Sequence, residues 1–148
     1  MTNKKSIASK STPIWFWAAS GIALLWNLMG LLAFTAQMMM TEESLASLPQ
    51  AQQDVYNSIP TLVYVFFGIA VIAGVAGSTL LLIRNKLAIP ALVVSLVGVL
   101  VQYGHMFFMT ETVSVMGAAA MILPVLVVIV SIALVPFATT CNKKGILR

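Results

Sequence analysis

The chain has 148 residues, of which 60% are hydrophobic and only 8% are charged, and its mean hydropathy is +1.01. A soluble domain usually carries about 25% charged residues, so this composition excludes a water-soluble protein and indicates one compact domain in lipid. The net charge of +4 does not indicate a nucleic-acid partner, because the basic residues lie in three short clusters at the ends of apolar segments.

The first apolar segment covers residues 14–40 and follows a basic segment, 1–13. Thr12 and Pro13 are typical of a helix start, with Thr12 as the N-cap and Pro13 at the first helical position. Lysines before an apolar segment also describe a signal peptide, but the apolar core of such a peptide is only about 7–15 residues long. We therefore predict a retained transmembrane helix.

The segment between residues 41 and 60 is the longest connection. Ser47 and Gln50 have the spacing of a capping box, with Pro49 inside the first turn. Apolar residues follow at helical spacing, namely Leu48, Ala51, Val55 and Ile59. We predict a short amphipathic helix here, lying on the outer face of the membrane.

Three further apolar segments cover residues 61–83, 87–109 and 113–138. Each has the length of about 20 residues that a helix needs to cross the hydrocarbon core, and the alternating pattern of a barrel is absent. The connections between these segments are so short that consecutive helices must be antiparallel neighbours. We predict an all-α membrane protein with a single transmembrane domain, 14–139, folded as an up-down-up-down four-helix bundle.

The charged residues divide between the two ends of this bundle. The basic clusters fall in segment 1–13, in the second connection and in a tail, 140–148, whereas all four acidic residues fall in the first and third connections. By the positive-inside rule, both termini are then cytoplasmic. Trp15 and Trp17 lie at the inner boundary of the first segment, as the residues of an aromatic belt do.

Polar side chains inside the apolar segments are candidates for function, because each is costly to hold in lipid. One stripe of the first helix carries Asn27 and Gln37, and one stripe of the third carries Gln102 and His105. We expect the stripes to face one another, with Asn27 and Gln102 within hydrogen-bonding reach, directly or through a water. The predicted site is a shallow polar cavity that opens outward and is lined, together with Tyr103, by Asn27, Gln37, Gln102, His105 and Glu111.

The same polar residues also fit a purely structural role. Amides in membrane helices often form interhelical hydrogen bonds worth about 0.6 kcal/mol each, and this is the more common role for groups such as Asn27 and Gln102. No metal site and no cofactor are predicted, because His105 and Cys141 are the single histidine and the single cysteine of the chain.

The second apolar segment presents small residues on one face. They are Ala70, Gly74, Gly77 and Ser78. Such a ridge lets helix backbones approach closely, and the sequence leaves open whether the partner is a helix of the same chain or of another subunit. In the last apolar segment, Pro124 lies near the centre and predicts a kink.

No catalytic motif is complete. Intramembrane proteolysis or acyl transfer needs a nucleophile and a base at one depth, and the apolar segments hold one histidine and no aspartate. We therefore predict that the protein is not an enzyme. The leading hypothesis is that it handles or transports a small solute, and the alternative is a structural or regulatory subunit that acts through helix packing. The expected partners are membrane lipids and either further copies of the chain or a larger membrane complex.

Several local patterns occur together between Trp15 and Phe108. They are Trp26-Asn27-Leu28-Met29-Gly30, the connection from Met40-Thr41 to Leu48-Pro49-Gln50, and Leu81-Leu82-Ile83-Arg84 with Pro90 and Ser95-Leu96. The combination resembles a group of small four-helix bacterial inner-membrane proteins of uncharacterised function, some of which are automatically labelled "sugar transporter". The resemblance implies the bacterial inner membrane as location and favours transport, and it implies no particular substrate or site residue.

Overall fold

The computed structural model describes residues 11–109 and 111–148, so that most of the predicted segment 1–13 lies outside the described residues. The long helices are α1 (Ile14–Met38), α4 (Thr61–Leu82), α5 (Ala88–Met109) and α7 (Ile122–Lys143). The short ones are α2 (Glu42–Ala46), α3 (Gln50–Ser58), α6 (Thr112–Met116) and the 3-10 turn η1 (Ala118–Met121). The described residues contain no strand. Four of their helices are long and apolar enough to cross a membrane, which confirms the all-α class and the number of candidate spans.

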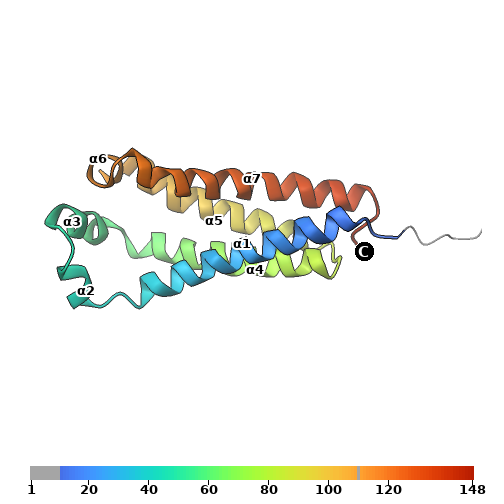
Figure 1. The fold of residues 1–148 in the computed structure, drawn as a ribbon, viewed down its shortest axis with the longest axis horizontal. Coiled ribbons are helices and arrows are strands. Elements are labelled where there is room, and N and C mark those ends of the chain that lie inside the picture. Colours follow the sequence, from blue (N-terminus) through green and yellow to red (C-terminus); the bar gives the residue numbers. More distant parts are fainter. Residues whose placement is uncertain (1–10, 110) are drawn as a thin grey trace, which may run out of the picture.

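Consecutive long helices run in opposite directions and pack in chain order (Figure 1). α4 and α5 form the central pair, α1 packs along α4, and α7 packs along α5. α1 and α7 meet at the end of the bundle where α1 begins, where the rings of Phe16 and Phe137 stack with their centroids 6.4 Å apart. At the opposite end, α2, α3 and α6 lie beyond the long helices (Figure 1).

Three helices start directly after a proline. Pro13, Pro49 and Pro60 occupy the N-cap positions of α1, α3 and α4, each with ψ between 142° and 145° and without a side-chain capping bond. Proline suits such a position because it has no N–H group to leave unpaired. The prediction of Thr12 as the N-cap is therefore wrong by one residue. The predicted capping box is also absent, because the Ser47 hydroxyl donates to a carbonyl oxygen of α2.

The last apolar segment is not the single helix predicted for residues 113–138. Gly117 has a φ of +82°, a left-handed conformation that favours glycine, and it separates α6 from η1 and α7. The candidate span is accordingly Ala118–Lys143. Pro124 lies in the first turn of α7, where its missing N–H group interrupts no helical hydrogen bond. The predicted central kink at this proline is therefore wrong.

The residues after α7 close one end of the bundle. Arg84, which follows α4 with a left-handed φ of 63°, donates from Nε to the Ile146 carbonyl oxygen at 2.8 Å. The Arg84 carbonyl oxygen accepts a hydrogen bond from the Arg148 N–H group at 2.6 Å. The tail predicted for 140–148 thus continues α7 as far as Lys143 and then folds back onto the bundle. The buried cluster at this end contains Phe16, Leu81, Ala88, Leu92, Ala138, Cys141, Ile146 and Leu147.

The closest helix contact lies between α4 and α5. A Cβ atom added to Gly98 would lie 2.8 Å from the Ala70 Cβ and 2.8 Å from a backbone carbonyl oxygen of α4. Beside this crossing, the buried Ser95 hydroxyl donates to the Ala70 carbonyl oxygen at 2.7 Å. Gly77 makes a similar contact, because a Cβ there would lie 2.8 Å from the Leu92 side chain. Glycine is therefore needed at both positions for the helices to approach this closely.

The small residues of α4 also receive α1. A Cβ atom added to Gly74 would collide with Asn27 Oδ1, and the Asn27 Nδ2 donates to the Ser78 Oγ at 2.9 Å. Ala70 and Gly77 thus contact α5, whereas Gly74 and Ser78 contact Asn27 of α1. The ridge that the sequence predicts is covered by helices of the same chain, so it does not offer a surface to a second copy.

We expect Gly98→Ala to lower the thermal unfolding midpoint in detergent, because the new methyl group must displace backbone atoms of α4, at a cost of about 1–3 kcal/mol. The matched control is Gly104→Ala on the same helix, since a Cβ there meets no atom within 4 Å. Alanine also favours the helix over glycine, so this control should unfold at the same temperature or higher. Equal midpoints for the two variants would contradict the tight α4–α5 crossing.

Candidate functional site

A cavity of about 250 Å³ lies at the end of the bundle where α3 and α6 are found. α1, α4 and α5 form its walls, and residues of α3 and α6 complete them. Its hydrogen-bonding groups are amides, phenols, a hydroxyl and one imidazole, contributed by Gln37, Tyr56, Tyr64, Gln102, Tyr103, His105 and Thr112. We call it the outer cavity.

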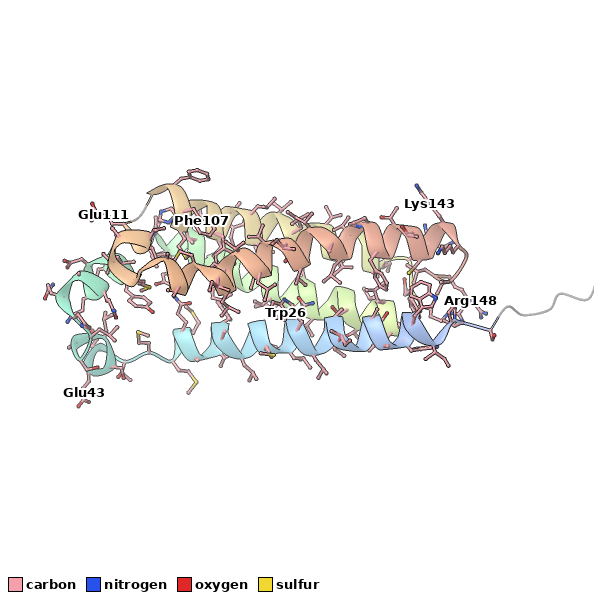
Figure 2. All side chains as sticks on the ribbon, turned by 45° about the horizontal axis from the view of Figure 1, so that its top comes forward. Trp26, Glu43, Phe107, Glu111, Lys143 and Arg148 are labelled. Atoms are coloured by element: carbon pink, nitrogen blue, oxygen red, sulfur yellow. The ribbon has the colours of Figure 1, made fainter. Side chains whose placement is uncertain are left out.

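A second cavity, of about 230 Å³, lies deeper between the long helices. All four of them contribute to this inner cavity: Trp26 and Asn27 from α1, Ser95 from α5, Val127 and Ser131 from α7, and further residues from α4. Figure 2 labels Trp26 about halfway along the bundle. The two cavities adjoin, because both are lined by Ala33, Phe67, Gln102 and Tyr103.

The residues predicted from the sequence are distributed over these two cavities. Gln37, Gln102 and His105 line the outer cavity, and Asn27 and Gln102 line the inner one. Glu111 is not among the lining residues of either cavity. It is exposed at the N-cap of α6, and the adjacent residue of that helix, Thr112, lines the outer cavity in its place. Because α6 starts at this point, the Glu111 side chain lies at the rim rather than in the wall.

The hydrogen bonds of Asn27 differ from the expected pairing with Gln102. Its amide nitrogen donates to the Ala23 carbonyl oxygen at 2.8 Å and to the Ser78 Oγ at 2.9 Å. Both N–H donors of the amide are thus used within α1 and toward α4, and its Oδ1 lies against Gly74 of α4. The expected direct bond to Gln102 is absent, and a bond through a water stays a prediction. The physical reason for the bond to α4 is the absence of a side chain at Gly74, which lets α1 and its amide lie close against α4.

The polar stripes of α1 and α5 also meet at the inner cavity. Asn27 bonds to Ser78 of α4, and the Ser95 hydroxyl of α5 donates to the Ala70 carbonyl oxygen of α4. A Cβ atom added to Gly74 would lie against both Asn27 Oδ1 and Ser95 Oγ, and both residues line the inner cavity. Further toward α3 and α6, the stripes share the outer cavity through Gln37 on α1 and through Gln102 and His105 on α5.

Two tyrosines of the outer cavity were missed by the sequence analysis. Tyr56 comes from α3, and Tyr64 comes from the first turn of α4 and lines the cavity together with Gln37. Tyrosines near helix ends are common at membrane–water interfaces, so their positions in the sequence indicate only an aromatic belt. The helical spacing of the first connection was the available signal for Tyr56, because it predicted a helix at this end.

Neither cavity is lined by the side chain of an aspartate, glutamate, lysine or arginine in the described part of the chain. The described residues also hold no group of three or more His, Cys, Asp and Glu side chains suited to a metal ion. Apolar walls with a few hydrogen-bonding groups are typical of sites for small molecules. The arrangement is therefore suited to an uncharged ligand. No protein-family model, curated protein or solved structure matches the chain.

We expect a double-mutant cycle to detect the bond between Asn27 and Ser78. Asn27→Leu and Ser78→Ala should each destabilise the protein, and the double variant should lose less than the sum by about 0.6 kcal/mol, the average for such bonds in membrane helices. The matched cycle combines Asn27→Leu with Gln102→Leu and should be additive. Coupling in the second cycle with additivity in the first would contradict the assignment. The free energy of unfolding in mixed micelles is the measurement.

Proposed function

We propose that the protein crosses the bacterial inner membrane four times and handles a small solute in the cavity at its outer end, without being an enzyme. The observation that carries this proposal is the pair of adjoining cavities among the four long helices. Asn27 and Ser95 are bonded between helices, as expected for packing. Gln102 and His105 have no such bond between helices among the described residues, and they line the cavities that would admit a ligand.

The distribution of charge supports an orientation with both termini in the cytoplasm. Figure 2 shows Glu43 and Glu111 at one end of the bundle and Lys143 and Arg148 at the other. Arg84 belongs to the second end, because it bonds to Ile146. Basic residues favour the cytoplasmic side, so the outer cavity, near α3 and α6, faces away from the cytoplasm in this proposal.

The alternative proposal is a structural or regulatory subunit of a larger membrane complex, or a homo-oligomer, without a solute site. It is favoured by the residues that join helices, such as Asn27 and Ser78. In that case the polar groups around Gln102 bond to one another in a packed contact between helices that contains no water, which we call the dry seam. The resemblance to inner-membrane proteins labelled "sugar transporter" agrees with the first proposal and leaves the solute open.

We expect a reporter enzyme that is active only in the periplasm to be active when fused after Ser47 and silent when fused after Asn142. Ser47 is an exposed residue between α2 and α3, whereas Asn142 lies at the end of α7 beside the basic cluster. The expected result follows from the positive-inside rule. The opposite pattern would reverse the orientation, and activity at both positions would exclude the three crossings expected between them.

We expect a cysteine at position 105 or 102 to react with a water-soluble methanethiosulfonate reagent added from the outside. His105→Cys and Gln102→Cys place the thiol in the outer cavity, which in this proposal is open to water. The matched control is Val101→Cys, the residue beside Gln102, which is exposed on the apolar outside of α5 and lines neither cavity. It should stay unmodified in lipid. The unaltered chain is the negative control, and it should not react because its cysteine, Cys141, is buried.

Labelling at 105 and 102 without labelling at 101 supports a solute site. No labelling at either cavity position, in variants that fold as judged by their unfolding midpoints, would contradict the solute proposal and favour the dry seam of the alternative. The same variants therefore discriminate between the two proposals, since only a hydrated cavity gives the reagent a path to the thiol.

A further inference from the structure

We propose that the ligand is an uncharged amphiphile with one apolar chain. Its hydrogen-bonding head occupies the outer cavity, and its chain occupies the inner cavity and reaches the lipid between α1 and α7. This inference rests on the proposed solute site and adds the chemical class of the ligand and the route by which it arrives. It follows from the difference between the two cavities, from an opening at the side of the bundle and from the absence of Asp, Glu, Lys and Arg among the described residues of the walls.

The inner cavity is suited to a hydrocarbon chain. Most of the side chains that line it are apolar, and they include Trp26, Met29, Leu123 and Val127. Two of its polar groups are already bonded, Asn27 to Ser78 and Ser95 to a backbone oxygen of α4. A polar solute that moved from the outer cavity into this space would exchange bonds with water for apolar contacts, which is unfavourable. A methylene chain forms no hydrogen bonds with water, so its transfer into this space has no such cost.

The inner cavity opens sideways between α1 and α7. Met29 of α1 and Leu123 of α7 both line it, and yet 63% and 61% of their surfaces are exposed. Side chains that line a cavity and are also exposed mark its mouth. The helices that pack along their length are α1 with α4, α4 with α5 and α5 with α7. The aromatic contact of α1 with α7 lies far from this mouth, at Phe16 and Phe137. Both helices are candidate spans, so the opening faces lipid.

The outer cavity is suited to a neutral polar head. Gln37, Gln102 and His105 offer hydrogen-bond donors and acceptors, and Tyr103 lies at the boundary of the two cavities. A charged head would enter a site whose described walls contain no Asp, Glu, Lys or Arg side chain, and a buried charge without a partner is strongly disfavoured. A hydroxyl, ester or amide head meets no such penalty. The two cavities together reach the range of roughly 300–1,000 Å³ that small-molecule sites occupy.

Trp26 makes the inference testable, because it lines the inner cavity. Trp15→Phe and Trp17→Phe leave Trp26 as the single tryptophan of the three. The purified chain is placed in phosphatidylcholine nanodiscs, and a monoglyceride with a dibrominated stearoyl chain is added as a quencher. We expect fluorescence quenching that saturates at low mole fraction and is reversed by the unbrominated monoglyceride. Dibrominated phosphatidylcholine, which reports contact with bulk lipid, should quench without saturation.

Variants separate binding in the cavities from binding on the surface. Ala33→Phe blocks the junction of the two cavities and should remove the saturable part of the quenching. The matched control, Ala36→Phe, adds the same ring to an exposed residue of α1 that lines neither cavity, and it should leave the quenching unchanged. Gln102→Leu removes one partner of the head and should weaken binding about fivefold, the equivalent of one hydrogen bond.

The outcomes distinguish this inference from the solute proposal. Quenching by the monoglyceride that equals quenching by bulk lipid and resists competition overturns the inference. Equal saturable quenching by dibrominated stearate, as the carboxylate, overturns the neutral head. If the cysteine at position 105 is still labelled from water in either case, the solute site stands and only its amphiphilic ligand is wrong. Saturable quenching without labelling at 105 overturns the placement of the head and the solute proposal together.

Discussion

The close crossing of α4 and α5 at Gly98 and Ala70 is the contact on which the rest of the structure depends. Lipid gives apolar helices no hydrophobic reason to associate, so close packing and interhelical hydrogen bonds must hold them together. Both occur here, since an added Cβ at Gly98 would lie 2.8 Å from Ala70 and the Ser95 hydroxyl bonds to the Ala70 carbonyl oxygen beside it. Because α1 then packs on α4 and α7 on α5, the two outer helices stand apart and the cavities form between them.

The two ends of the bundle are built differently, and only one of them carries the outer cavity. At one end, Phe16 stacks on Phe137, and Arg84 ties the residues after α7 to the connection between α4 and α5. This end has a buried apolar cluster. The other end carries the outer cavity, which α3 and α6 line together with the long helices. In the proposed function, the ligand enters through the outer cavity or between α1 and α7.

The polar residues of the helices fall into two groups with different physical roles. Asn27 and Ser95 form hydrogen bonds to α4, and these bonds join α1 and α5 to α4. Gln37, Gln102 and His105 line space in which a ligand or water supplies the remaining bonds. Position along the helix separates the groups, because α4 has Ala70, Gly74 and Ser78 where Asn27 and Ser95 approach it and carries Phe67 and Tyr64 beside the outer cavity.

The sequence by itself determined the number of candidate spans and indicated lipid as the solvent, since these follow from the length of the apolar segments and from composition. It also indicated that Gln37, Gln102 and His105 share one cavity, because helical spacing puts them on facing stripes near one end. Only the tertiary structure decided that Asn27 bonds to Ser78, that Glu111 stays at the rim and that Gly117 delays the start of α7. Those outcomes depend on how closely and at what rotation helices meet, and that is set by contacts between residues such as Gly74 and Asn27, which lie far apart in the chain.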